Sequence, residues 1–193
     1  MITVFFDGLS NPANPGIGTY GFIIYIDSKK VKEGYGALGV DVTNNQAEYT
    51  ALIKALEWLV KKGLTHEKVV VKGDSQLVIR QLNGQYAVKA PRILLLFEKA
   101  MKLIQKFSDI SFLWIPREEN EEADSLSRKA YIEYVTGNPS VLEKYKRFLA
   151  TEKQKQLMDK LKISYSFYIS KREASKLISQ KLKQTKVKVN RKS

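Results

Sequence analysis

The segment Ile2-Thr3-Val4-Phe5-Phe6-Asp7-Gly8 ends a run of apolar and β-branched residues with an acid and a glycine. Such a run favours a buried strand, so the segment predicts a strand that ends at Asp7. Tyr20–Ile26 and Val31–Leu38 have the same character, and turn-forming residues separate the three runs. The start of the chain therefore predicts an antiparallel meander.

Further along the chain, strand-like and helix-like segments alternate. Thr43-x-x-Gln46 predicts a capping box, and the apolar spacing after it predicts a helix to Val60. Two more strands are predicted at Lys68–Lys72 and Ser111–Ile115, and helices at Ser75–Leu82, Pro91 to about Phe107, and Asn120–Val135. Strands joined through helices pair in parallel. The sequence thus predicts an α/β fold, a mixed five-stranded sheet with three antiparallel strands and then two parallel ones, flanked by helices.

The positive charge of the chain is concentrated near its C-terminus. The chain has 193 residues and a net charge of +13; residues 1–135 hold 17 Lys/Arg and 16 Asp/Glu, whereas residues 136–193 hold 16 and 4. The turn-forming Thr136-Gly137-Asn138-Pro139 marks the change. We therefore expect a nearly neutral globular domain, 1–135, and a basic, helical C-terminal extension, 136–193. The extension would dock on the domain, dimerise or bind a polyanion such as nucleic acid.

This extension carries its own helix signals. Ser140-x-x-Glu143, Thr151-x-x-Gln154 and Ser170-x-x-Glu173 predict three capping boxes. Ile163–Ile169 alternates apolar with mostly polar residues, which indicates an extended connector. Lys186–Ser193 lacks periodic apolar residues and is predicted to fray.

The composition disfavours several classes of protein. No apolar run approaches the roughly eighteen residues of a membrane span, so no membrane partner is expected. The chain starts in strand-like sequence, so no secretory leader is expected. It has no cysteine, which excludes disulfides and thiolate metal sites. We expect a cytoplasmic protein.

Four acids lie where apolar runs meet helices: Asp7, Glu48, Asp74 and Asp124. Acids cost free energy in such places unless a positive group offsets them. A divalent cation would do so, and carboxylate oxygens suit Mg²⁺ or Mn²⁺. Each acid also has a structural alternative: Asp7 in a turn, Glu48 in a first turn that favours the helix dipole, Asp74 as an N-cap, and Asp124 as a solvated charge. Their joint placement favours the metal site.

Five motifs follow one another along residues 1–135: Phe6-Asp7-Gly8, Asn14-Pro15-Gly16, Thr43-Asn44-Asn45-Gln46-Ala47-Glu48, Gly73-Asp74-Ser75-Gln76 and Asn120-x-x-Ala123-Asp124. In this order the chain resembles the type 1 ribonuclease H family, in its archaeal and bacterial form. The resemblance implies an endonuclease that hydrolyses the RNA strand of an RNA–DNA hybrid and leaves a 5′-phosphate and a 3′-hydroxyl. It makes the four acids the catalytic and metal-binding residues.

The physical chemistry of the acids agrees with that family's reaction. Four carboxylates close together would repel, and some would protonate without a cation. Two divalent ions about 3.5–4 Å apart would gather them. One ion would lower the pKa of the attacking water, and the other would stabilise the leaving 3′ oxygen during in-line displacement.

The resemblance also implies contacts with the substrate. The RNA strand would be contacted by glycine, hydroxyl and amide residues: Gly8, Asn14, Asn45, Gln46, Ser75 and Gln76. Thr43 would hold a phosphate of the DNA strand. Telling RNA from DNA requires groups that read the 2′-hydroxyl. The structural alternative for these residues is a role in turns and helix caps.

The chain departs from many family members at two places. The loop Pro116-Arg117-Glu118-Glu119 lacks the family's mobile histidine. Arg117 is the candidate substitute; a guanidinium binds the scissile phosphate but cannot act as a base at neutral pH. The family's basic protrusion is missing as well, because Gln85–Ala90 supplies only Lys89. We therefore expect the C-terminal extension to supply duplex-binding charge, with four aromatic side chains as core or contact residues: Tyr145, Phe148, Tyr165 and Phe167.

Two other functions stay open at this point. The chain could also be a broader nuclease that cuts double-stranded RNA or RNA–DNA junctions, because these duplexes share A-like character with the RNA–DNA hybrid. From a different class comes a catalytically silent nucleic-acid-binding module. Four intact acids argue against that module, and a metal-dependent cleavage assay separates the two.

Overall fold

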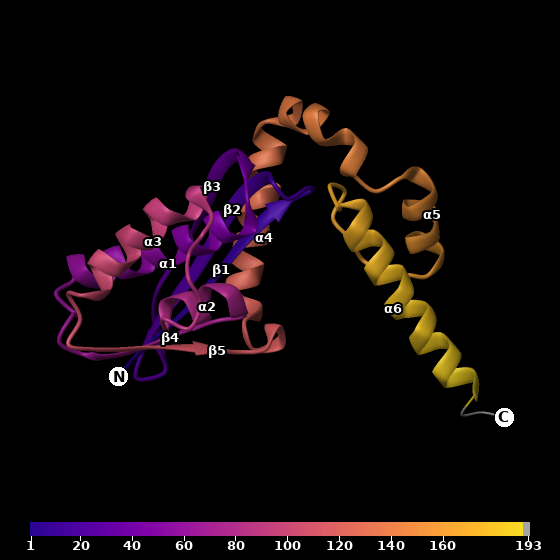
Figure 1. Ribbon diagram of the computed structural model, residues 1–193. Coiled ribbons are helices and arrows are strands. Elements are labelled where there is room, and N and C mark those ends of the chain that lie inside the picture. The colour runs from indigo at the N-terminus through magenta and orange to yellow at the C-terminus, as the bar shows by residue number, and fades with distance from the viewer. Residues whose placement is uncertain (191–193) are drawn as a thin grey trace.

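The structure is a computed structural model that describes residues 1–190, with side chains described as far as Gln184. Its elements begin with three strands and a helix, continue with a strand, two helices and a fifth strand, and end with helices (Figure 1). They are β1 (Ile2–Asn11), β2 (Gly16–Ile26), β3 (Lys29–Val42), α1 (Asn44–Lys61), β4 (Lys68–Gly73), α2 (Gln76–Leu82), α3 (Pro91–Ile104), β5 (Asp109–Trp114), η1 (Arg117–Glu119), α4 (Glu121–Gly137), η2 (Pro139–Phe148), α5 (Glu152–Lys160) and α6 (Lys171–Asn190).

The five strands form one sheet in the order β3-β2-β1-β4-β5. β1 pairs antiparallel with β2, and β2 antiparallel with β3, whereas β1–β4 and β4–β5 are parallel. The mixed sheet predicted from the sequence is therefore confirmed. The parallel pairs arise because each of these strands is reached through a helix that crosses the sheet.

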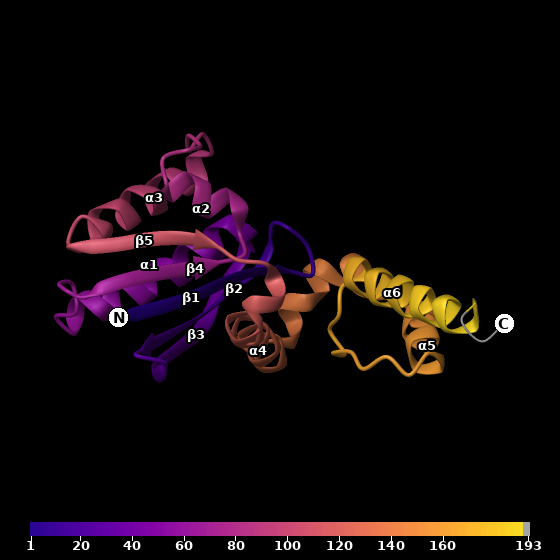
Figure 2. The same ribbon diagram turned by 90° about the horizontal axis from the view of Figure 1, so that it is seen from below.

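Helices cover both faces of the sheet (Figure 2). α1 packs on β1 and β2, and α3 packs on α1. The main core lies between the sheet and these helices. It includes the β1 side chains that point toward α1, which are Ile2, Val4 and Phe6. α4 packs on β1, β2 and β3 from the opposite face. β1 therefore sends alternate side chains to two different helices, as the pleat of a strand requires.

β1 is longer than the sequence predicts, and this places Asp7 inside the strand. Its parallel pairing with β4 ends at Phe5 opposite Lys72. Its pairing with β2 continues to Asn11 opposite Ile17. The prediction that the strand ends at Asp7 is wrong because β2 still pairs with β1 after β4 has stopped. Asp7 consequently lies in β1 just beyond the last residue that pairs with β4.

The C-terminal extension docks on α4 and then forms a small core of its own. Leu142 and Tyr145 of η2 bury themselves against Ile17 and Val135. Further on, Ala150, Met158, Ile169 and Ala174 pack together between α5 and α6. In Figures 1 and 2, α5 and α6 stand beyond one end of the sheet.

Two of the sequence predictions for the extension need correction. The box at Thr151 forms as predicted, but the one at Ser140 is wrong. Pro139 suits the first position of a helix, so Asn138 becomes the N-cap of a 3₁₀ helix instead. The segment predicted to fray is helical to Asn190, and residues 191–193 lie outside the described residues. In residues 1–190 no helix is long and apolar enough to cross a membrane.

The capping box at the start of α1 offers a test of local stability. Thr43 Oγ1 accepts from the backbone N–H of Gln46, and Gln46 Oε1 accepts from the backbone N–H of Thr43 (2.9 Å). Thr43→Ala is expected to lower the free energy of unfolding by about 1 kcal/mol, measured by urea denaturation. The matched control Ser125→Ala, on the exposed side of α4, should stay within about 0.5 kcal/mol of wild type. Equal stability of the two variants would contradict the cap.

Candidate active site

Asp7 lies on the α4 face of β1 and is almost fully buried, with 8% of its surface exposed. The Ser127 hydroxyl, from α4, donates a hydrogen bond to Asp7 Oδ2. Ser127 Oγ also lies 2.9 Å from the carbonyl oxygen of Asp124, one turn earlier in the same helix. The turn predicted as a structural alternative for Asp7 is wrong, because Asp7 sits in a continuous strand. Its carboxylate is fixed from the helix that also carries the fourth acid.

Glu48 approaches from the opposite face of the sheet, on α1. Because α1 begins at Asn44, Glu48 lies beyond the first turn, and the prediction of a first-turn acid is wrong. Gly8 lets β1 come very close to it: a Cβ at Gly8 would stand 2.1 Å from the backbone nitrogen of Glu48. Glu48 Oε2 is buried and has no hydrogen-bond partner among the described residues. A buried, unpaired carboxylate oxygen of this kind calls for a functional explanation.

Asp74 follows β4 and is held by Asn120. Asn120 Nδ2 donates to Asp74 Oδ1 (2.7 Å) and to the carbonyl oxygen of Phe6 (3.0 Å), so one buried amide connects the middle of β1 to the residue that follows β4. Trp114 Nε1 also donates to the backbone oxygen of Asp74 (3.1 Å). The N-cap of α2 is Ser75, whose hydroxyl accepts from Val78 N–H (3.4 Å), so the capping alternative for Asp74 is wrong.

Asp124 lies in the first turn of α4 between two arginines. Arg117 Nη2 donates to Asp124 Oδ1 (2.6 Å), and Arg128 Nε donates to Asp124 Oδ2 (2.7 Å). Its side chain is 19% exposed. Asp124 is therefore no freely solvated charge, and this structural alternative is also wrong. Arg117, the predicted substitute for a histidine, contacts the fourth acid directly.

The electrostatics show that the acids lie close to one another. Burial raises the pKa of Asp7 to about 7; the Ser127 hydroxyl opposes this rise, while Asp124 and Asp74 add to it. Burial also raises the pKa of Glu48 to about 8, against the Ser75 hydroxyl and with help from Asp7 and Asp74. Carboxyls that share a buried region cannot all ionise cheaply. Asp7, Glu48 and Asp74 therefore form one electrostatically interacting group, and Asp124 acts on this group through Asp7.

The donor set fits a hard divalent cation. All four groups offer carboxylate oxygens, the ligands that Mg²⁺ and Mn²⁺ prefer, and the partnerless Glu48 Oε2 is an open ligand atom. Within residues 1–190, however, no three His, Cys, Asp or Glu side chains already form a group that would hold a metal ion. Cation binding therefore requires these side chains to reorient. Asp124, with both oxygens engaged by arginines, has the most partners to exchange.

The predicted substrate residues fall into two groups. Asn14, Thr43 and Asn45 line one hollow of about 670 Å³, together with Arg92 at the start of α3. The others surround the acids and already have structural tasks: Gly8 admits α1, Gln46 closes the capping box, Ser75 caps α2, and Gln76 opens that helix. The structural alternatives for Thr43, Gln46 and Ser75 are thus confirmed as roles they have in the fold. Substrate contact stays a prediction for all seven residues.

Three residues at the site were missed by the sequence predictions as members of it. They are Asn120, which holds Asp74, Ser127, which holds Asp7, and Arg128, which holds Asp124. Ser127 and Arg128 stand three and four positions after Asp124, on the same side of α4. That spacing was the available signal. Asn120 is buried with 1% exposure, which its place at the start of a helix does not suggest.

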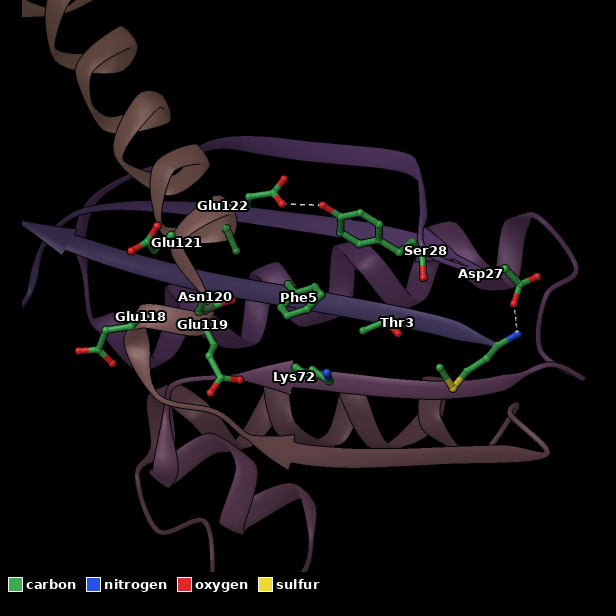
Figure 3. A pocket seen from close by; sticks show the side chains of 13 residues that line it. Thr3, Phe5, Asp27, Ser28, Lys72, Glu118, Glu119, Asn120, Glu121 and Glu122 are labelled. Atoms are coloured by element: carbon green, nitrogen blue, oxygen red, sulfur yellow. Dashed lines mark hydrogen bonds and ion pairs between the residues drawn. The ribbon is translucent and has the colours of Figure 1, made fainter.

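A larger hollow, of about 760 Å³, lies beside the acids but includes none of them (Figure 3). Phe5 and Lys72 form part of its floor, and glutamates from η1 and α4 surround one end. Across it, Glu122 accepts a hydrogen bond from the Tyr25 hydroxyl (2.6 Å). The fourth acid instead borders a separate hollow of about 250 Å³, shared with Arg117, Glu118 and Glu121. Of the four acids, Asp124 lines the smaller of these two hollows, and none lines the larger one.

Comparison with known proteins identifies this arrangement. A family model described as "Reverse transcriptase-like" matches residues 5–130. The crystal structure of RNase H1 from the halophilic archaeon Halobacterium salinarum is 38% identical, with a TM-score of 0.63 over 68% of this chain and 98% of that chain. The chain belongs to the type 1 ribonuclease H family. Both the resemblance and the fold class expected from the sequence are confirmed.

Other members of the ribonuclease H family show the same relation. LC11-RNase H1, whose crystal structure is a complex with an RNA/DNA hybrid, is 34% identical, with a TM-score of 0.66 over 70% of this chain and 99% of that chain. The "Bifunctional protein Rv2228c" of Mycobacterium tuberculosis is 39% identical over 119 residues, 61% of this chain. The match spans only 32% of that relative's length. The family match ends at residue 130, before the C-terminal extension begins.

Proposed function

We propose that this chain is an endoribonuclease that hydrolyses the RNA strand of RNA–DNA hybrids. One observation carries the proposal: in a ribonuclease H fold, a buried and unpaired Glu48 oxygen stands among acids that interact electrostatically. Relatives in this family are ribonucleases, and one of them is known in complex with an RNA/DNA hybrid. The proposed products are a 5′-phosphate and a 3′-hydroxyl.

The four acids would hold two divalent cations, Mg²⁺ or Mn²⁺. When bound, such cations supply activation of water and stabilisation of the leaving 3′ oxygen. The residues of this chain prepare the ligands for that task. Ser127 fixes the rotamer of Asp7, and Asn120 fixes that of Asp74 against the backbone of Phe6. Held in this way, Asp7 and Asp74 would need less reorganisation than Asp124, whose two arginine contacts would have to be exchanged first.

Arg117 would bind the scissile phosphate. It reaches the site from η1, where its guanidinium already contacts Asp124 (2.6 Å). Its charge suits the negative charge of a phosphate, and its pKa excludes a role as general base. Arg117 would therefore position the substrate and stabilise charge, while proton transfer is left to water and the carboxylates.

Recognition of the hybrid would use the hollow that Asn14, Thr43 and Asn45 line. Amide side chains at this place can donate to and accept from 2′-hydroxyls, which distinguish RNA from DNA. Arg92, in the same hollow, offers a cation for a phosphate of the second strand. The hollow would thus bind one strand by its hydroxyls and the other by its charge.

The decisive experiment compares four labelled duplexes: RNA–DNA hybrid, double-stranded RNA, an RNA–DNA junction and DNA. Each is incubated with Mg²⁺, Mn²⁺ or a chelator, and the product ends are identified. Metal-dependent cutting of the hybrid's RNA strand is the expected result. Equal cutting of double-stranded RNA or the junction would establish the broader nuclease instead. Binding without any cutting would overturn the proposal and establish the silent module.

The C-terminal extension would add affinity for the duplex through its charge. Lys171, Lys176 and Lys183 are exposed along α6. Replacing all three with Gln is expected to weaken hybrid binding and to reduce the slope of log K against log salt by up to about three. Fluorescence anisotropy at several salt concentrations measures both quantities.

A matched control removes the same charge from the other end of the fold. Lys61, Lys102 and Lys106 are exposed at the C-terminal ends of α1 and α3, away from α6 (Figure 1). Their replacement with Gln should leave affinity and slope nearly unchanged. Equal losses in the two triple variants would contradict a specific role for the extension. Truncation at Val135 is a poorer test, because it uncovers Ile17 and Tyr131, which η2 buries.

A further inference from the structure

We propose that the C-terminal extension sets the cation affinity of the active site through a line of ion pairs that ends on Asp124. Arg128 and Glu173 are the positioning residues in this line. The inference rests on the function proposed above, because it takes Asp124 as a ligand of the cations. It assigns to the extension a second role, separate from any contact with nucleic acid.

The line of ion pairs runs from α6 to the fourth acid without a gap. Glu173 Oε1 accepts from Arg128 Nη1 at 2.7 Å, and Arg128 Nε donates to Asp124 Oδ2, also at 2.7 Å. Arg128 thus uses different nitrogens for the two carboxylates. Planar guanidinium groups hold two such partners in a fixed relative direction. The direction in which Arg128 presents its charge to Asp124 therefore depends on Glu173.

Neighbouring contacts keep Glu173 in place. It lies at the start of α6, where its backbone N–H donates to Ser170 Oγ (3.1 Å). The same part of the extension is attached to α4 by the Tyr131 hydroxyl, which donates to the carbonyl oxygen of Tyr168 (3.2 Å). The side chains of Arg128 and Glu173 are 37% and 28% exposed. A partly buried, networked pair is screened less by salt than an isolated surface pair.

The charges in this line balance one another. Arg117 and Arg128 bring two positive charges to Asp124, and Glu173 supplies a second negative charge. Without Glu173, an excess positive charge would stand beside Asp124 and repel a divalent cation. Arg128 would also keep Asp124 as its only carboxylate partner among the described residues, which makes exchange for a cation harder. Both effects would lower the affinity of the site for a divalent cation.

The test is Mg²⁺ binding to the full chain, measured by isothermal titration calorimetry without substrate. Glu173→Gln is expected to raise the Mg²⁺ dissociation constant about threefold to tenfold, as for coupled members of one ion-pair network. In an Arg128→Met background the same change should alter that constant by less than about twofold. Circular dichroism melting confirms that each variant is folded. Should Arg128→Met fail to fold, Glu173→Asp replaces it and should recover most of the wild-type affinity.

Glu152→Gln is the matched control. It makes the same change of charge in the same extension, but Glu152 pairs with Lys155 on α5 rather than with α4. An equal loss of Mg²⁺ affinity in this variant would reduce the effect to general charge and overturn the inference. Wild-type affinity in Glu173→Gln, or an undiminished effect in the Arg128→Met background, would overturn it as well.

The outcomes also separate this inference from the proposed function. If the wild-type chain cuts hybrids but Glu173→Gln binds Mg²⁺ with wild-type affinity, the proposed function stands and the role of the ion pairs is refuted. If the wild-type chain and the variants bind Mg²⁺ as expected but the wild-type chain cuts no nucleic acid, the role of the ion pairs stands and the proposed function is refuted. If the wild-type chain binds no divalent cation, both proposals are refuted.

Discussion

Asp7→Asn is expected to reduce the rate of hybrid cleavage by about a thousandfold or more, the size of effect seen when a central catalytic group is removed. Asp7 is the central acid of the site, because its carboxylate interacts electrostatically with Asp74, Asp124 and Arg117. The Ser127 hydroxyl orients this carboxylate. An amide has nearly the same shape but lacks the charge that holds a cation. The loss should therefore appear in kcat rather than in folding. Single-turnover cleavage of a labelled hybrid in Mg²⁺ measures it.

Asp109→Asn is the control for this experiment. Asp109 begins β5 and is exposed, and none of the hollows beside the acids includes it. Its replacement should leave the cleavage rate within about twofold of wild type. A fully active Asp7→Asn enzyme would refute the assignment of the four acids.

Glu48→Gln is expected to stabilise the metal-free protein in alkaline solution. The pKa of Glu48 rises from 4.5 to about 8 on folding, chiefly through burial. A carboxyl whose pKa is higher in the folded state holds its proton better there, so it contributes stability below its unfolded pKa and loses that contribution as pH rises to the folded value. The window for Glu48 therefore runs from about pH 4.5 to pH 8.

The expected result is a stability difference that grows with pH. Near pH 4 the variant and wild type should have similar free energies of unfolding, and by about pH 8.5 the variant should be more stable by roughly 2 to 4 kcal/mol. Urea denaturation in the presence of a chelator measures this difference. Added Mg²⁺ should reduce it, because a cation relieves the same charge in the wild type. A difference that does not change with pH would show that Glu48 ionises freely in the folded state.

Local signals in the sequence were enough for the topology. The capping boxes at Thr43 and Thr151 form because both of their hydrogen bonds lie within four residues. The box at Ser140 fails because its neighbour Pro139 starts the helix earlier. Strand ends depend on neighbouring strands, which a local pattern does not contain. β1 accordingly passes Asp7, since β2 continues beside it.

The candidate site was predictable in part for the same reason. The four acids could be named because each stands next to an apolar run in the sequence, although the structure places Asp7 inside β1 and Glu48 inside α1. Their partners depend on how helices dock. Ser127 reaches Asp7 only because α4 docks on β1, and Glu173 reaches Arg128 only because the extension folds back on that helix. The contact between Arg128 and Asp124, in contrast, follows from their i, i+4 spacing within α4. The raised pKa values are likewise products of packing.

The close approach of β1 and α1 at Gly8 has a consequence for the history of this enzyme. Because main chain lies against main chain there, the separation between Asp7 and Glu48 is set without help from any side chain at the contact. Surrounding residues are then free to diverge while Asp7 and Glu48 keep their distance. A larger residue at position 8 would force the two apart, so lineages that retain catalysis should keep this glycine however far the rest of the sequence drifts.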